Sequence, residues 1–331
     1  MSRTQLLATV RGFSTHVASS GQVLGLRAGF ATVRALPAPP AYRLFAAIAD
    51  LTTQRGGKGV ARLRANYARV RPELSGPALD ALVAAGMRSY MRYYCDAFRL
   101  AERTPAELAA AVRTQGDKPV RESLAAGQGT VVFLGHLGNW DTAGAWSSLH
   151  LAPVTTVVER LEPEEVFRDF LSFRESLGMT IIPLTGGDDP FLVLKRAVAG
   201  GDFVCLLADR DLTRGGVEVD LCGHRARMAK GPAVLSLMTG APLYTAGVWY
   251  EDAPDLPGGK RVVIDFTPVR IPEVGTTRDK VQAMVQNCAD ILGEVIRTHT
   301  EDWHMMQRVF VDDLEDPPQV LTTRAAEAAA S

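Results

Sequence analysis

The feature that most constrains the fold is a short apolar run, Thr130–Leu134, which follows two glycines, Gly127 and Gly129. A strand with one face in water alternates apolar and polar residues, whereas this run has no such alternation. It therefore predicts a strand that is buried on both faces of a parallel sheet. Such a sheet has helices packed on both sides, so this one run favours an α/β fold.

The rest of the chain continues this pattern. Further strands are predicted at 154–158, 180–183, 203–207, 217–221, 243–250 and 261–266, and helices at 139–149, 163–177, 190–200, 231–239 and 279–298. Residues from about 15 to 113 follow a helical pattern, and Thr104-Pro105 begins a helix there. We expect an α/β fold with a central, mostly parallel sheet flanked by helices. The expected organisation is a basic helical N-terminal region packed on the core (1–115), an α/β core (116–316) and a disordered Ala-rich tail (317–331).

The charge is unevenly distributed along the chain. Residues 1–100 contain 14 Lys and Arg against four acidic residues, a balance of +10, although the whole chain has a net charge of −1. A basic N-terminal third indicates an anionic partner, a membrane surface or nucleic acid, or else simply a solvated helix face. No zinc knuckle, RNP-type strand or heptad-backed basic region accompanies the charge, so we expect no nucleic-acid partner.

No segment is typical of a signal peptide or a membrane-spanning helix. The first 20 residues lack an apolar core, and the longest uncharged run, 231–250, is interrupted by proline and glycine. The four cysteines have no C-x-x-C spacing, which predicts neither a metal site nor a disulfide framework. If a membrane is the partner, this chain is expected to lie on its surface without spanning it.

The most specific motif follows the first predicted strand and reads His136-Leu-Gly-Asn-Trp-Asp141. The carboxyl end of a buried strand is where α/β sheets place their sites. A turn at Gly138 would let Asp141 reach the imidazole and orient it, so that the other ring nitrogen acts as a general base toward a hydroxyl. The alternative is a histidine that caps the strand end, with Asp141 stabilising the first turn of a helix.

Two further groups of polar residues lie in the second half of the chain. Asp209 comes shortly after the predicted strand 203–207, which could place it near His136. Arg225, Arg227 and Lys230 precede a helix start at Gly231-Pro232 and would suit an anionic phosphate group, unless they are only solvated cations. The chain lacks a G-x-S-x-G elbow, a phosphate loop, a G-x-G-x-x-G turn and an H-E-x-x-H site, so covalent serine catalysis, a nucleotide cofactor and a metal ion are not expected.

Taken together, these motifs resemble the lysophospholipid acyltransferase superfamily, whose hallmark is H-x-x-x-x-D, and within it the lipid A late-acyltransferase branch. The resemblance covers roughly residues 40–310. It is most specific to the actinobacterial phosphatidylinositol mannoside acyltransferases. The segments that carry it are Arg64-Ala-Asn66-Tyr, Glu159-Arg160-Leu, Arg174-Glu-Ser-Leu-Gly, Pro183-Leu-Thr-Gly-Gly187, Asp209-Arg-Asp-Leu-Thr-Arg-Gly-Gly and Arg227 to Ala241.

The resemblance implies an enzyme that moves a long fatty acyl group, typically palmitoyl, from acyl-CoA to a mannose hydroxyl of a mannosylated phosphatidylinositol. It implies a peripheral protein on the cytoplasmic face of the plasma membrane, with acyl-CoA as a donor substrate and no cofactor. His136 would be the general base and Asp141 its orienting partner. Asp209 stands where the family usually has a glutamate that contacts the histidine, so a direct contact and a water bridge both remain open.

The resemblance also implies roles in substrate binding for several residues. Glu159 and Arg174 match positions that shape the pocket, and Arg227 belongs to the candidate phosphate-binding group. The loop at Arg214-Gly215 and the helix position Met238 match the wall along which acyl-CoA lies. Three alternatives stay open at this point: another glycolipid or lysophospholipid as acceptor, a thioesterase that delivers the acyl group to water, and a lipid-binding relative without turnover.

Overall fold

The computed structural model describes residues 33, 36–159, 164–185, 189–213 and 215–314. Its helices are α3 (Ala38–Arg55), α4 (Lys58–Val70), α5 (Gly76–Leu100), α6 (Pro105–Ala110), α7 (Lys118–Ala125), α8 (Trp140–His150), α9 (Glu164–Ser176), α10 (Pro190–Ala199), α11 (Gly231–Thr239), α12 (Thr277–Thr298), the 3₁₀ helix η1 (Thr300–Asp302) and α13 (Val311–Leu314). Its strands are β1 (Val112–Gln115), β2 (Thr130–Leu134), β3 (Val154–Val158), β4 (Thr180–Pro183), β5 (Phe203–Leu207), β6 (Val217–Leu221), β7 (His224–Met228), β8 (Leu243–Asp252) and β9 (Lys260–Pro268).

Seven of these strands form one sheet in the order β1-β9-β8-β2-β5-β3-β4. All neighbouring pairs are parallel except β8 and β9, which form an antiparallel pair, so β9 and β1 run opposite to the other five strands. Strands β6 and β7 form a separate antiparallel hairpin. The predicted fold class, an α/β fold with a mostly parallel sheet, is confirmed.

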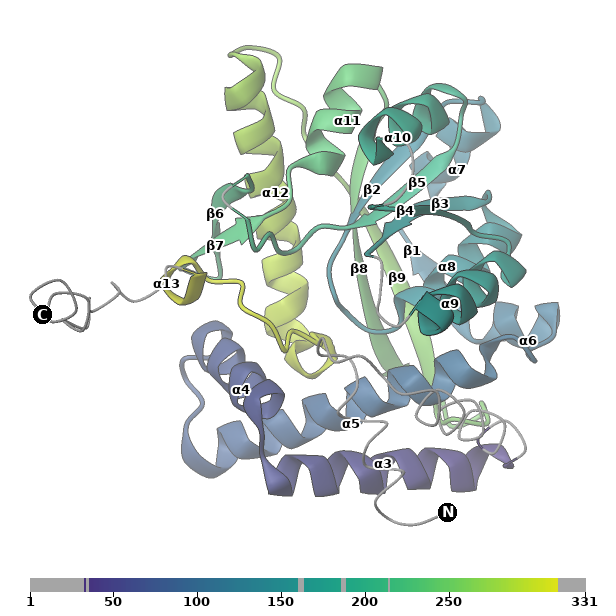
Figure 1. Ribbon diagram of the computed structural model, residues 1–331, viewed down its shortest axis with the longest axis vertical. Coiled ribbons are helices and arrows are strands. Elements are labelled where there is room, and N and C mark those ends of the chain that lie inside the picture. The colour runs from purple at the N-terminus through teal and green to yellow at the C-terminus, as the bar shows by residue number, and fades with distance from the viewer. Residues whose placement is uncertain (1–32, 34–35, 160–163, 186–188, 214, 315–331) are drawn as a thin grey trace, which may run out of the picture.

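Helices cover both faces of the sheet, and the buried strand β2 shows why (Figure 1). Its side chains Val131 and Phe133 belong to one apolar core together with α10, α11 and α12. Val132, between them, belongs to a second core together with α6, α7 and α8. Because successive side chains of a strand point to opposite faces, an apolar run without alternation supplies both cores at once.

The N-terminal helices α3, α4 and α5 lie across one end of the sheet, below β8 and β9 in the view of Figure 1. Helix α5 is 25 residues long and packs against η1 and α8. The buried hydroxyl of Tyr67, on α4, donates a hydrogen bond of 3.0 Å to the carbonyl oxygen of Trp303. This helical layer therefore contacts the segment that follows the last long helix of the core.

Sequence and structure differ at several element boundaries. The helical pattern assigned up to residue 113 hides the strand β1, which is short, lies at the sheet edge and follows helix α6 directly. Strand β7 was not predicted, because its charged residues His224, Arg225 and Arg227 do not look like a strand and lie on a two-stranded hairpin outside the main sheet. The capping box at Thr104 and Glu107 confirms the predicted helix start.

Two expectations fall outside the described residues: the first helical residues before Val33 and the tail 317–331. Within the described ranges, no helix is both long enough and apolar enough to cross a membrane.

Candidate active site

The register of the sheet brings His136 and Asp209 together. Strands β2 and β5 are parallel neighbours, and Leu134 is paired with Leu207. His136 and Asp209 each follow their paired leucine by two residues, so both leave the sheet at the same carboxyl edge. The imidazole Nδ1 lies 2.6 Å from Asp209 Oδ1, and the backbone N–H of His136 donates to Asp209 Oδ2 over 2.9 Å. Asp209 therefore contacts the histidine directly, without a bridging water.

Asp209 is fully buried, and its charge is held by its neighbours. Burial opposes ionisation, but the His136 ring, the His136 backbone N–H and the Trp303 indole N–H outweigh it and lower the pKa of Asp209. An ionised carboxylate only accepts hydrogen bonds, so Nδ1 must carry the ring proton. The neutral ring then has its lone pair on Nε2.

Nε2 is the atom that can act on a substrate. The His136 side chain remains 23% exposed, and within the described part of the chain Nε2 makes no hydrogen bond. A histidine whose tautomer is fixed by a buried carboxylate can take a proton from a hydroxyl and stabilise the resulting imidazolium. Among the described residues, no group of three or more His, Cys, Asp and Glu side chains is placed to hold a metal ion.

Asp141 does not occupy the place expected for it beneath the imidazole. Asn139 accepts a hydrogen bond from the Thr142 backbone N–H and begins helix α8 there, so Asp141 lies in the first helical turn. Its buried carboxylate pairs with Arg174 of α9, over 2.8 Å from Oδ1 to Nε, and accepts a hydrogen bond from the Tyr93 hydroxyl of α5. The carboxylate on Nδ1 is Asp209, and Asp141 instead joins three helices beside the site.

The ion pair between Asp141 and Arg174 is largely buried, with 3% of the Asp141 side chain and 18% of the Arg174 side chain exposed. Burial disfavours the guanidinium charge, but Asp141 outweighs it and raises the pKa of Arg174. Breaking a buried pair from one side leaves the other charge uncompensated, at a cost of about 3–5 kcal/mol.

Arg174→Met should therefore lower the free energy of unfolding by about 3 kcal/mol, measured by urea denaturation. The matched control is Arg168→Met on the same helix, where the side chain is 74% exposed and a change within about 0.5 kcal/mol is expected. Adding Asp141→Asn to Arg174→Met should recover part of the loss, because the stranded charge is then gone. Equal effects of Arg174→Met and Arg168→Met would contradict this account.

Gly138 gives the loop between β2 and α8 its shape. Its φ of +55° is unfavourable for other residues, and a Cβ there would lie 2.7 Å from the carbonyl oxygen of Val248. The Gly138 N–H donates to the carbonyl oxygen of Asp302 over 2.8 Å, and the His304 N–H donates to the carbonyl oxygen of His136 over the same distance. The segment 302–304 thus holds the loop on both sides of Leu137, directly after His136.

The side chains of Asp302 and His304 form a buried polar cluster with Ser89. The Ser89 hydroxyl of α5 lies 2.9 Å from His304 Nε2 and donates to the Asp302 carboxylate. Burial raises the pKa of Asp302 to about 6. Burial, and then the nearby His136, lower the pKa of His304 to about 3. His304 is therefore a neutral, structural neighbour of His136 at physiological pH.

Asp302→Asn should make the fold more sensitive to acid between pH 6 and pH 4.5. In that window the folded wild type binds a proton at Asp302 that the unfolded chain releases, which stabilises the fold as the pH falls. The unfolded chain binds a proton at His304 that the folded protein excludes, which opposes it. The two effects offset each other in the wild type, and the variant keeps only the second.

The free energy of unfolding of Asp302→Asn should therefore fall relative to wild type by up to about 1.4 kcal/mol per pH unit below pH 6. Urea denaturation at a series of pH values measures this difference. Asp80→Asn, an exposed carboxylate, is the control and should follow the wild-type curve. Parallel curves for Asp302→Asn and wild type would rule out the offset.

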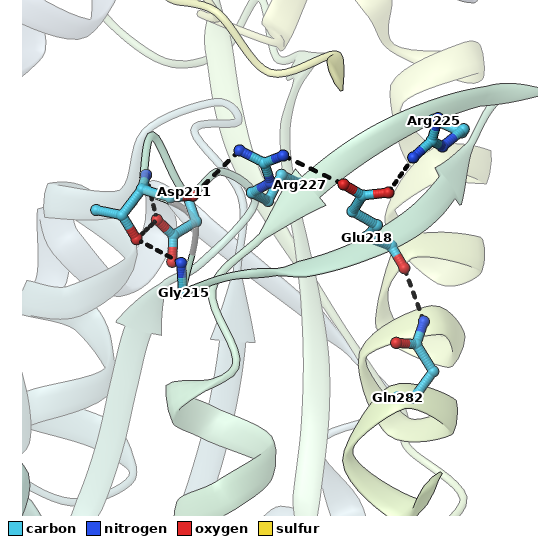
Figure 2. A network of polar contacts seen from close by, with 7 residues as sticks. Asp211, Gly215, Glu218, Arg225, Arg227 and Gln282 are labelled. Atoms are coloured by element: carbon cyan, nitrogen blue, oxygen red, sulfur yellow. Dashed lines mark hydrogen bonds and ion pairs between the residues drawn. The ribbon is translucent and has the colours of Figure 1, made fainter. Parts of the chain in front are cut away.

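Two of the three candidate phosphate-binding cations, Arg225 and Arg227, have partners in the protein (Figure 2), whereas Lys230 is exposed just before α11. Glu218 of β6 pairs with both Arg225 and Arg227 of β7, and its backbone carbonyl accepts from Gln282 of α12 over 2.7 Å. Arg227 also donates to the carbonyl oxygen of Thr213 over 3.2 Å, and its own carbonyl accepts from the Asp211 N–H. Arg227, whose side chain is only 12% exposed, fixes the loop after β5 rather than standing free for an anion.

The other predicted binding residues lie on separate elements of the fold. Gly215 is exposed in the loop after β5, where its N–H donates to Thr213 Oγ1 over 3.0 Å. Glu159 is exposed just beyond β3, at the same carboxyl edge of the sheet as His136. Met238 is 51% exposed on α11. Arg214 lies outside the described residues, and the structure places neither Glu159 nor Met238 in contact with His136.

Sequence reasoning missed two residues of the site. Tyr93 lies in the middle of a helix with regular apolar spacing, which gives no sign that its hydroxyl meets Asp141. Trp303 donates its indole N–H to Asp209 over 3.2 Å, across 94 residues of sequence. The only available signal was the run Glu301-Asp-Trp-His304, in which polar and aromatic residues directly follow a long amphipathic helix.

Comparisons with known proteins show which sequences this chain is similar to. The sequence profile of the family described as bacterial lipid A biosynthesis acyltransferase matches residues 11–311. A phosphatidylinositol mannoside acyltransferase of Mycolicibacterium smegmatis is 40% identical over 307 residues, which cover 92% of this chain and 96% of that protein. The protein of the same name from Mycobacterium tuberculosis is 38% identical over 292 residues, 87% of this chain and 88% of that protein.

Proposed function

The chain belongs to the bacterial lipid A biosynthesis acyltransferase family and is an acyltransferase, and we propose that it transfers a long-chain fatty acyl group, such as palmitoyl, from acyl-CoA to a mannose hydroxyl of a mannosylated phosphatidylinositol. The names of the relatives supply the acceptor class. The observation that carries the reaction is the buried Asp209 on Nδ1 of His136, which leaves Nε2 as the base.

In the proposed reaction, Nε2 of His136 takes the proton of the acceptor hydroxyl as the hydroxyl oxygen attacks the thioester carbonyl carbon. The tetrahedral intermediate then collapses, the carbon–sulfur bond breaks and CoA leaves as a thiolate. The imidazolium returns its proton to the thiolate or to water. The thioester supplies the activation, so the reaction needs no further cofactor.

The oxyanion of the intermediate needs hydrogen-bond donors. The Gly138 N–H, close to His136 in sequence, is already bound to the carbonyl oxygen of Asp302. The first turn of α8 begins at Trp140, within the same loop-to-helix junction as His136. Among the described residues the backbone N–H groups of Trp140 and Asp141 have no partner, and these two groups, at the positive end of the helix dipole, are the donors we propose.

The decisive experiment measures thiol release from palmitoyl-CoA by the purified protein, with and without a phosphatidylinositol mannoside, together with mass spectrometry of the lipid. A lipid heavier by one palmitoyl group is the expected product. Thiol release without a lipid product would indicate hydrolysis. A product formed only from a lysophospholipid would keep the chemistry and replace the acceptor. No thiol release by the folded protein with any of these acceptors would exclude the proposal.

We further propose that the protein binds the cytoplasmic, anionic surface of the membrane through its basic N-terminal region. In residues 33–100 each of the four acidic side chains is paired with an arginine. Arg43, Arg55 and Lys58 remain exposed, and among the described residues they have no acidic partner. Such cations contribute roughly 1 kcal/mol each near an anionic bilayer.

The triple variant Arg43→Gln, Arg55→Gln and Lys58→Gln should bind vesicles of anionic phospholipid at least about tenfold more weakly than wild type at low salt. Wild-type binding should weaken as salt is added. The control triple Lys118→Gln, Arg196→Gln and Arg278→Gln removes the same charge from exposed helix positions elsewhere and should bind almost as wild type. Binding that ignores salt, or equal loss in both triples, would refute this surface.

A further inference from the structure

Trp303 donates a hydrogen bond to the carboxylate that holds the His136 ring. Its indole Nε1 lies 3.2 Å from Asp209 Oδ2, the oxygen that also accepts from the His136 backbone N–H over 2.9 Å. The other oxygen, Oδ1, faces Nδ1 of the ring over 2.6 Å. Both Trp303 and Asp209 are completely buried, so water cannot replace a missing donor without entering the core.

The position of the indole is fixed by three separate parts of the fold. The Trp303 carbonyl oxygen accepts a hydrogen bond from the Tyr67 hydroxyl of α4, and the Trp303 backbone N–H donates to the carbonyl oxygen of Thr300 over 3.1 Å. The Trp303 backbone also forms an isolated antiparallel bridge with Leu137, next to His136. The ring packs edge-on against Phe310. A ring of the same shape without the N–H would make the same apolar contacts, so packing alone does not account for the N–H directed at Asp209.

A buried carboxylate with two donors on one oxygen has a defined orientation. A tilt of the Asp209 carboxylate plane out of this orientation would move its oxygen away from the Trp303 and His136 N–H groups and leave both without an acceptor. Buried donors without partners are strongly disfavoured. The orientation in turn fixes the direction in which the His136 ring presents Nε2.

We propose that Trp303 is a positioning residue for acyl transfer, and that its indole N–H locks the Asp209 carboxylate so that the His136 ring stays aimed at the acceptor hydroxyl. The role of Trp303 in acyl transfer rests on the proposed function. The geometric part, an indole N–H that orders the carboxylate and ring, can be tested in the absence of any activity.

The sharpest variant replaces Trp303 with benzothienylalanine, which keeps the shape of the indole and removes only the N–H. A hydrogen bond to an ionised group is among the stronger ones, so we expect kcat to fall about tenfold. The KM values for palmitoyl-CoA and for the mannoside lipid should stay within about twofold. Trp146→Phe, at another buried tryptophan that does not touch Asp209, is the control and should keep the wild-type kcat.

A double-mutant cycle tests whether Trp303 acts through Asp209. In an Asp209→Asn background the benzothienylalanine substitution should change kcat by less than about twofold, because the carboxylate it positions is gone. A tenfold loss in both backgrounds would overturn the proposal, and so would a kcat within twofold of wild type in the single variant.

Nuclear magnetic resonance separates this inference from the proposed function. The Nδ1 proton of His136 should exchange with solvent at least tenfold faster in the benzothienylalanine variant than in wild type, whether or not the protein transfers an acyl group. The Trp303 indole proton of the wild type should resonate downfield and move upfield in Asp209→Asn. If exchange in the variant were the same as in wild type, the proposal would be overturned even if the enzyme were active. If exchange were faster in the variant but the wild type transferred no acyl group, the geometric inference would be supported and the proposed function rejected.

Discussion

His136→Ala should lower the rate of acyl transfer at least about 10³-fold while the protein stays folded. General-base catalysis is typically worth about 10²–10⁴-fold, and the described part of the chain places no second free imidazole beside His136. His304, the nearest other imidazole described, is neutral, buried and bound through Nε2 to Ser89. Thiol release that depends on the acceptor measures this loss.

The fold of this variant must be checked, because Asp209 loses the ring that faces its Oδ1. The carboxylate keeps two donors, the residue 136 backbone N–H and the Trp303 indole, so we expect a loss of about 1–3 kcal/mol rather than unfolding. His136→Gln, whose amide can donate to Asp209, should be better folded and equally inactive. His224→Ala on the β6–β7 hairpin serves as the control with wild-type activity. Transfer within tenfold of wild type in folded His136→Gln would remove His136 from the mechanism.

Asp209→Asn should lower the rate by about 10³–10⁴-fold, although it changes only an oxygen to an NH₂ group. The two donors on the Oδ2 position, from His136 and Trp303, force the amide oxygen to take that place. The amide NH₂ must then face Nδ1 of His136. Nδ1 can accept a hydrogen bond from this NH₂ only if it carries a lone pair and no proton. The ring proton therefore moves to Nε2, and Nε2 can no longer act as the base. The same exchange in the serine-protease triad lowers kcat about 10⁴-fold for the same reason.

The tautomer can be observed directly. Nitrogen-15 shifts of His136 should report a proton on Nδ1 in the wild type and on Nε2 in Asp209→Asn. Melting temperatures of the two proteins should differ little, because the size of the side chain is conserved. If Asp209→Asn kept more than a tenth of the wild-type rate, or if its ring kept the wild-type tautomer, the role of Asp209 in orienting the base would be wrong.

The N-terminal helices belong to the same working unit as the sheet. Helix α5 supplies Tyr93 to the Asp141–Arg174 pair and Ser89 to the Asp302–His304 pair, and α4 supplies Tyr67 to the Trp303 backbone. These three side chains thus connect the N-terminal helices to residues that surround His136. We propose that the same helices meet the membrane, so the surface that binds lipid and the residues around His136 would share these helices.

Much of this could be predicted from local sequence. The apolar run Thr130–Leu134 requires helices on both faces of a parallel sheet, and the motif from His136 to Asp141 follows at the edge where such sheets place their sites. Gly138 and Asn139 are also local, since a positive φ favours glycine and a helix start favours asparagine. These features depend on residues a few positions apart, which a single sequence displays in full.

Only the tertiary structure decided which carboxylate lies against Nδ1 of His136. Asp141 is five residues from His136, but the start of α8 turns it toward Tyr93 and Arg174. Asp209 is 73 residues away, yet the register of β2 with β5 sets it against Nδ1. Trp303 is farther still and reaches Asp209 only because the segment after α12 folds back beside Leu137. Strand pairing and chain return are set by the packing of the whole core, so residue spacing alone does not determine such contacts.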